Sequence, residues 1–185
     1  MFQKIVESSR HSRSKYLGPI SSFLLKLGVT PNMLTTLSLI SGLLSVYFLF
    51  DNYVYFIIFG ISHLILDGFD GVLARRTKET ITGKYFDLIT DNFIAVLLLI
   101  KLGYYLLDFY PYIIAGLYAI AIFFHVTRDY PTWYLRTSSL AVLAVATFPG
   151  FPYETTLLII GYLTAGVVAV YSLVMQLQHV IKKIN

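Results

Sequence analysis

The 185-residue chain is 57% hydrophobic and only 13% charged, with a formal net charge of +4 at pH 7. A soluble domain of this size would not need so apolar a composition for its core, so we expect a membrane-embedded protein. The chain contains no cysteine, which excludes disulfides, thiolate metal sites and cysteine nucleophiles.

The first 30 residues combine basic side chains with apolar ones at roughly helical spacing. This pattern is typical of an interfacial amphipathic helix on an anionic leaflet, and the alternative is a disordered basic tail followed by a loop. We expect residues 1–30 to form a cytoplasmic juxtamembrane segment, followed by a helical domain over residues 31–185. The basic residues are Lys4, Arg10, Arg13, Lys15 and Lys26, against the single acid Glu7.

Six apolar segments follow, each about long enough to cross the roughly 30 Å hydrocarbon layer of a bilayer. Gly28 is expected to end the amphipathic helix, and Thr30-Pro31 to begin the next one. Because the loops are short, the sequence predicts an all-α integral membrane protein with six transmembrane helices in one bundle. The expected spans are 32–50, 53–74, 83–101, 112–128, 132–148 and 155–178.

The basic residues segregate by side when these spans are threaded through a membrane. All of the 14 Lys and Arg residues except Lys101 fall on the side of the N-terminus. Lys101 shares the other side with Asp51, Asp108 and Glu154. By the positive-inside rule, both termini and the loop after the second span face the cytoplasm of a cell-membrane protein.

One stretch, residues 67–91, holds four of the ten acidic residues of the chain. The first two acids are three residues apart and the last two are four apart, so each pair shares a helix face. Grouped carboxylates in a membrane repel one another unless cations neutralise them, and ligands that are all oxygen favour Mg²⁺, Mn²⁺ or Ca²⁺. With a basic loop between the pairs, the stretch predicts a site for two divalent cations and a polyphosphate. The acids are Asp67, Asp70, Asp87 and Asp91, and the basic residues are Arg75, Arg76, Lys78 and Lys84.

The spacing of this stretch resembles the signature of the CDP-alcohol phosphotransferase family, D-x-x-D-G-x-x-A-R followed by G-x-x-x-D-x-x-x-D. A second family feature, P-[ND]-x-x-T, matches residues 31–35, and the family's six-helix bundle with an interfacial helix covers essentially the whole chain. The loop between the two halves is one residue shorter here than in the family pattern. The matching positions are Asp67, Asp70, Gly71, Ala74, Arg75, Gly83, Asp87 and Asp91.

The resemblance implies an enzyme in which an acceptor hydroxyl displaces CMP from a CDP-linked lipid, either CDP-diacylglycerol or its archaeal equivalent. It implies that Asp67, Asp70 and Asp87 hold two divalent cations, Mg²⁺ or Mn²⁺. Asp91 would be the general base and a ligand of the second cation. The nucleotide-binding residues carried over are Asn32, Thr35, Gly71, Ala74, Arg75, Thr80 and Gly83.

Arg128 and Arg136 flank the turn between the fourth and fifth spans and are candidate ligands of an acceptor phosphate. The pattern is similar to that of phosphatidylglycerophosphate synthases and favours a phosphorylated polyol, such as glycerol 3-phosphate or inositol phosphate, as acceptor. Those enzymes usually have an arginine where this chain has Ser38. Two alternatives stay open: the arginines are positive-inside anchors, or the acceptor is serine or another unphosphorylated alcohol.

A small ion-coupled transporter is the alternative from another class, because intramembrane acids also serve ion transport. The acids cluster at one membrane face beside a basic loop, whereas a transporter would place them near the midplane. No nucleic-acid partner is expected. Gly161 and Ala165 permit close helix packing, which suggests a homodimer. His63, one turn before Asp67, is interpreted as a packed helix residue.

Overall fold

The computed structural model describes residues 19–77 and 80–184. Most of the predicted amphipathic segment lies outside these residues, but residues 19–26 are helical. Gly28 follows with a φ of 77°, a left-handed conformation that favours glycine and ends the helix as predicted.

The described residues form helices and no strands, which confirms the all-α class. Two predicted starts are confirmed by their caps. The Thr30 hydroxyl accepts a hydrogen bond from the Met33 N–H over 3.3 Å, and the Asn52 side chain accepts one from the Tyr55 N–H over 3.1 Å. The helices after residue 30 are α2 Pro31–Phe48, α3 Tyr53–Arg76, α4 Ile81–Leu106, α5 Tyr110–Arg128, α6 Arg136–Ala146 and α7 Glu154–Ile184.

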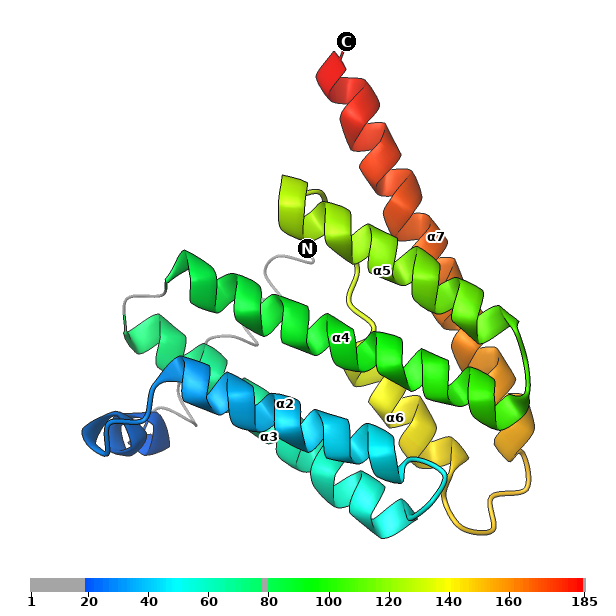
Figure 1. The fold of residues 1–185 in the computed structure, drawn as a ribbon, viewed down its shortest axis with the longest axis horizontal. Coiled ribbons are helices and arrows are strands. Elements are labelled where there is room, and N and C mark those ends of the chain that lie inside the picture. Colours follow the sequence, from blue (N-terminus) through cyan, green and yellow to red (C-terminus); the bar gives the residue numbers. More distant parts are fainter. Residues whose placement is uncertain (1–18, 78–79, 185) are drawn as a thin grey trace.

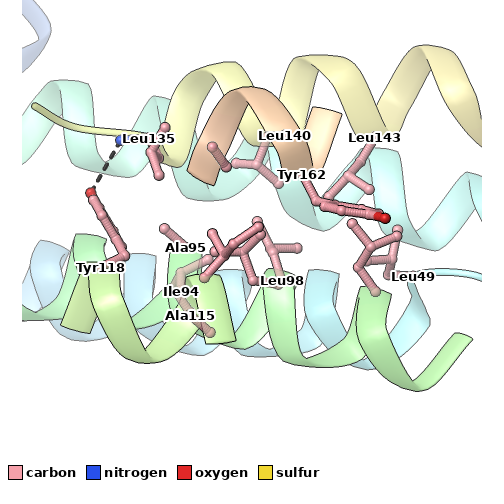
Figure 2. Close-up of a cluster of buried hydrophobic side chains, with 14 of the residues drawn as sticks. Leu49, Ile94, Ala95, Leu98, Ala115, Tyr118, Leu135, Leu140, Leu143 and Tyr162 are labelled. Carbon is pink, nitrogen blue, oxygen red and sulfur yellow. Dashed lines mark hydrogen bonds between the residues drawn. The ribbon is translucent and has the colours of Figure 1, made fainter. Parts of the chain in front are cut away.

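Helix α4 lies at the centre of the bundle and packs against α2, α5, α6 and α7 (Figure 1). α2 packs along α3, and α7 contacts α5 and α6 before its C-terminal end projects past the other helices. Leu98 of α4 and Leu158 of α7, each 1% exposed, lie in the core that joins these elements. Figure 2 shows this core, with Leu98 among side chains from α5, α6 and α7.

Large apolar side chains cover the outside of the bundle as well as its interior. Phe123 is 62% exposed and Val167 is 69% exposed, as expected where the surrounding solvent is lipid. Among the residues that the structure describes, four helices, α2, α3, α5 and α7, are long and apolar enough to cross a membrane. The chain is therefore a helical membrane protein. The count of six spans is not confirmed, because α4 is outside this group and α6 has only 11 residues.

The predicted fifth span, 132–148, was wrong at its start, since α6 begins at Arg136. Pro131 has no N–H to donate and disfavours helix at the residue before it. The non-helical backbone is held by side chains of other helices instead. Gln176 donates to the Pro131 carbonyl over 3.3 Å, and the Ser172 hydroxyl accepts from the Trp133 N–H over 3.2 Å. Non-helical backbone inside a membrane requires such partners.

The end of the bundle far from the central acids has polar contacts of its own. Lys101 Nζ lies 2.7 Å from Asp51 Oδ2, and the Tyr162 hydroxyl donates to Asp108 Oδ2 over 2.6 Å. The hydrogen bond from Tyr162 lowers the pKa of Asp108, which lies in the loop between α4 and α5. The sequence assigned Lys101, Asp51 and Asp108 to one common side.

Gly161 and Ala165 pack inside the chain. A Cβ at Gly161 would lie 2.9 Å from Val142 Cγ1 of α6, and Ala165 is a buried core residue. The small side chain therefore permits α7 to approach α6 of the same chain. The suggestion that this pair forms a dimer surface was wrong, whereas a homodimer through another surface stays a prediction.

Candidate functional site

Asp67 of α3 and Asp91 of α4 meet at the guanidinium of Arg136, the first residue of α6. Arg136 Nη2 lies 2.5 Å from Asp67 Oδ2, and its Nη1 donates to Asp91 Oδ1. The three side chains are only 12% (Arg136), 16% (Asp67) and 21% (Asp91) exposed. A planar guanidinium has two parallel donors, so one residue of α6 joins an acid from each of two other helices.

A third acid, Asp87, completes a group that could hold a metal ion. One carboxylate oxygen from each of Asp67, Asp87 and Asp91 lies within 4.8 Å of the others. Asp87 and Asp91 are one turn apart on α4, which gives them the common face that the sequence predicts. Among the residues that the structure describes, these three acids are the group that lies close enough together to hold a metal ion.

Asp70 is the most buried of the four acids, at 3% exposed. Its Oδ2 accepts a hydrogen bond from the Thr35 hydroxyl of α2 over 2.9 Å. Its Oδ1 is buried and has no hydrogen-bond partner. A buried carboxylate oxygen left in this way is costly unless a cation meets it. This oxygen, together with a donor set made only of carboxylates, fits a hard divalent cation such as Mg²⁺ or Mn²⁺.

The short motif of residues 31–35 reaches both halves of the acidic stretch. Thr35 contacts Asp70, as above, and Asn32 lies beside Gly83 on α4. A Cβ at Gly83 would be 3.1 Å from Asn32 Oδ1 and 3.0 Å from Thr80 Oγ1. Glycine at this position therefore permits the start of α4 to approach α2. Thr80 is the N-cap of α4, since its hydroxyl accepts a hydrogen bond from the Gly83 N–H over 3.1 Å.

The remaining predicted nucleotide residues lie on the last turns of α3. Gly71 and Ala74 are half-buried and Arg75 is exposed. Arg75 Nη1 would lie 3.6 Å from a Cβ at Gly71, so the arginine side chain lies along its own helix beside Gly71. Here a phosphate would meet both a guanidinium and accessible backbone.

The two arginines predicted as an acceptor clamp differ in their contacts and exposure. Arg136 lies in the acidic group, whereas Arg128 is an exposed residue at the C-terminal end of α5. Among the described residues, no ion pair joins Arg128 to an acid of the site. Asp129, with a φ of 55°, is the C-cap of α5, and α6 begins at Arg136.

Ser38, the position noted for its missing arginine, is bonded to His63. Both residues are buried, and the Ser38 hydroxyl lies 2.8 Å from His63 Nδ1 and donates to the His63 carbonyl over 3.0 Å. Both residues therefore join α2 to α3 one turn from Asp67, and the interpretation of His63 as a packed residue is confirmed.

The sequence did not single out Asn92, which directly follows Asp91, or its hydrogen-bond partner Tyr118 of α5. The Tyr118 hydroxyl donates to Asn92 Oδ1 over 2.6 Å, and both residues are buried. No signal in the sequence indicated this pair, because the contact joins two helices that the sequence alone does not align.

The fold and the site together define a helical membrane protein with a carboxylate centre that fits divalent metal. The profile of the CDP-alcohol phosphatidyltransferase family matches residues 28–182, so the chain belongs to that family. It is a phospholipid-synthesising transferase with CDP-alcohol phosphotransferase activity, which replaces the alternative of a small transporter. Comparison of the sequence with curated proteins gave no match.

Proposed function

We propose that the protein transfers the phosphatidyl group of a CDP-linked lipid to the hydroxyl of a phosphorylated polyol and releases CMP. The observation that carries this proposal is the guanidinium of Arg136 between Asp67 and Asp91. It puts a fixed positive charge, suited to an acceptor phosphate, beside the carboxylate best placed to act as base.

Asp67, Asp70 and Asp87 would hold two divalent cations, with Asp91 as a further ligand. Enzymes of this family use divalent metal. When bound, the cations would neutralise negative charge on the diphosphate and on the departing CMP. Asn32, Thr35, Gly71, Ala74, Arg75, Thr80 and Gly83 would line the cytidine diphosphate pocket.

In the transfer step, Asp91 takes the proton of the acceptor hydroxyl as its oxygen bonds to the β-phosphorus of the donor. The bond between that phosphorus and the CMP oxygen breaks, and CMP leaves with the electron pair. The contact with Arg136 would place Asp91 beside an acceptor whose phosphate that arginine holds. The acceptor phosphate would be held on Arg136, which brings the reacting hydroxyl close to Asp91.

Arg136 alone supports the phosphorylated acceptor, because Arg128 lies outside the acidic group. Glycerol 3-phosphate and inositol phosphate are the candidates, and both present a dianion that needs fixed positive charge among four acids. Ser38 is engaged by His63, so it does not supply a second contact to the acceptor.

An apolar cavity supports a lipid donor. About 120 Å³ of space lies between α4, α6 and α7, lined by residues that include Leu98, Ser138, Val142 and Leu158. Its lining includes Leu135, which directly precedes Arg136, and continues along α6 to Leu143. A cavity of this size and lining takes a segment of hydrocarbon, so it suits one alkyl chain of a diacylglycerol or of its archaeal equivalent.

The six-span topology is part of the proposal. α4 has 26 residues, and α6 would cross together with the non-helical segment 129–135 before it. The segregation of basic residues supports cytoplasmic termini and a cytoplasmic site in the cell membrane. A homodimer remains part of the proposal, without the Gly161 surface.

The test is CMP release by the purified protein in detergent with CDP-diacylglycerol as donor. Separate reactions contain glycerol 3-phosphate, inositol phosphate, serine or no acceptor, each with Mg²⁺, Mn²⁺ or excess EDTA. We expect turnover with a phosphorylated polyol and divalent metal, and none in EDTA. The matched control is Asp91→Asn, which should stop transfer while CDP-lipid binding persists.

Two results would contradict separate parts of this proposal. Turnover with serine alone would remove the phosphate-binding role of Arg136, whereas undiminished turnover in EDTA would remove the metal centre. A protein inactive with every acceptor would be tested with an ether-lipid donor before the lipid donor itself is rejected.

A further inference from the structure

Tyr118 of α5 belongs to the apolar core, and its hydroxyl is buried there beside the polar side chain of Asn92. The residue is 0% exposed, and it lies at the edge of the cluster drawn in Figure 2, which also contains Ile94, Ala95 and Ala115. Its hydroxyl donates to Asn92 Oδ1 over 2.6 Å and accepts from the Leu135 N–H over 3.2 Å. A hydroxyl buried in such a core is stabilising only when its hydrogen bonds are made, and here both are.

The two partners of Tyr118 are chain neighbours of the two residues that meet in the site. Asn92 follows Asp91 on α4, and Leu135 precedes Arg136 at the start of α6. Asp91 and Arg136 are themselves ion-paired. The contacts therefore form a closed ring through three helices, with Tyr118 on the side opposite the ion pair.

The start of α6 depends on this hydroxyl. Leu135 occupies the N-cap position and no side chain within α6 caps the helix. Its N–H is buried, and the backbone before it is not helical, so the donor needs a partner from outside α6. On the other side, Asn92 is held in place because its Nδ2 donates to the Leu88 carbonyl over 2.7 Å.

We infer that Tyr118 is a positioning residue, which fixes the first turn of α6 against α4 and so sets the place of Arg136 relative to Asp91. This inference rests on the proposed function, in which Arg136 holds the acceptor and Asp91 takes its proton. Displacement of a substrate-binding group by about 1 Å costs up to about 100-fold in rate. The proposed cytidine diphosphate pocket contains neither Tyr118 nor its two partners, and Leu135 is only one of the 15 residues that line the apolar cavity. The main effect of losing the Tyr118 hydroxyl therefore falls on acceptor use.

The test is Tyr118→Phe, which keeps the ring and removes the hydroxyl. We expect kcat/KM for the acceptor to fall about 10- to 100-fold, while KM for the CDP-lipid stays within twofold. In combination with Arg136→Gln, the substitution should add little further loss, because its effect acts through Arg136. A purely structural role would give additive losses and would alter both substrates.

Tyr53→Phe is the matched control. The Tyr53 hydroxyl donates to the Ala144 carbonyl over 3.2 Å, near the opposite end of the same helix α6. Like Tyr118→Phe, Tyr53→Phe removes a tyrosine hydroxyl that contacts α6. Because this contact lies far from Arg136, the activity of Tyr53→Phe should be unchanged. Equal losses in the two variants, or a normal acceptor kcat/KM in Tyr118→Phe, would overturn the inference.

A distance measurement tests the placement independently of catalysis. Spin labels at cysteines replacing the exposed residues Ile89 of α4 and Thr137 of α6 report the separation of the two helices. We expect a broadened or shifted distance distribution in Tyr118→Phe and an unchanged one in Tyr53→Phe. An unchanged distance distribution in both variants overturns the inference, whether or not the parent protein is active. Failure of the parent protein to transfer to any acceptor would count against the proposed function alone. If Tyr118→Phe does not fold, Asn92→Ala, which breaks the ring at its other contact, is measured in the same ways.

Discussion

Thr35 Oγ1 donates a hydrogen bond to Asp70 Oδ2 over 2.9 Å and thereby joins the start of α2 to the acidic face of α3. The two residues belong to separate sequence motifs that are 35 positions apart. Because the other oxygen of Asp70 has no hydrogen-bond partner, Thr35 would set which oxygen a bound cation meets. Hydrogen-bond partners of this kind orient metal-binding side chains and raise the affinity of the site for its metal.

We predict that Thr35→Val weakens the binding of Mn²⁺ about 10- to 100-fold, the usual effect of losing such a partner. Thr35→Ser should keep most of the affinity, since it retains the hydroxyl. The affinity is measured by titration of free Mn²⁺ by EPR in detergent. Thr36→Val is the control, because the Thr36 hydroxyl bonds only within α2, to the Asn32 carbonyl over 2.9 Å. Equal affinities of Thr35→Val and the parent would show that Asp70 needs no orientation from α2.

We predict that Gly83→Ala raises KM for the CDP-lipid several-fold without lowering the melting temperature. The new Cβ would lie 3.1 Å from Asn32 Oδ1 and 3.0 Å from Thr80 Oγ1, so both side chains must shift. Alanine is also favoured over glycine in a helix by about 1 kcal/mol, which offsets the strain. Steady-state kinetics and thermal unfolding separate the two effects. In Gly116→Ala the new Cβ has open space, so this control should be stabilised and keep its KM.

The sequence predicted the helices best where local chemistry ends or begins them. Gly28, Thr30 and Asn52 act through their own backbone or side chain, and each boundary was correct. The start of α6 could not be predicted in this way. A hydrogen bond donated by Gln176 and one accepted by the Tyr118 hydroxyl replace those of the missing helical turn. Such contacts join residues far apart in the sequence, and local preference does not anticipate them.

The site residues divide in the same way, into those that local spacing predicts and those that depend on contacts between helices. The spacing of the acids brought Asp87 and Asp91 to one helix face, which is a property of a single helix. The eight-residue separation of Arg128 and Arg136 suggested a pair, but the left-handed residue Asp129 ends α5 between them. Asn92 gave no signal by itself, since its partner comes from another helix.

We predict that Arg136→Gln lowers kcat/KM for the phosphorylated acceptor about 30-fold or more, because loss of a buried charge-assisted contact costs about 2 kcal/mol or more. Arg136→Lys should recover only part of this loss, since it restores the charge but not the two parallel donors. Arg128→Gln is the control, and it should stay near the parent value because its side chain is exposed outside the acidic group. CMP release at varied acceptor concentration gives each value. Equal losses in Arg128→Gln and Arg136→Gln would restore the two-arginine clamp.

The last prediction is that α4 and α6 both cross the membrane, although neither is among the four helices that qualify by length and composition. α4 has 26 residues and is therefore about 39 Å long, enough for the hydrocarbon layer even with its acids at one face. α6 alone is only about 16 Å long. The non-helical segment 129–135 adds up to about 23 Å, and its hydrogen bonds to α5 and α7 let it lie inside the bundle.

Because the chain has no cysteine, single cysteines can report each side through a membrane-impermeant maleimide. Lys84→Cys and Asp108→Cys bracket α4, and Arg128→Cys and Tyr153→Cys bracket α6 with its preceding segment. We expect Lys84 and Arg128 to label from the cytoplasmic side and Asp108 and Tyr153 from the opposite side, as the segregation of basic residues requires. Lys84 and Asp108 labelling from one side would leave α4 within a single face of the membrane. Arg128 and Tyr153 labelling together would make α6 a re-entrant helix, and in either case the six-span topology would be wrong.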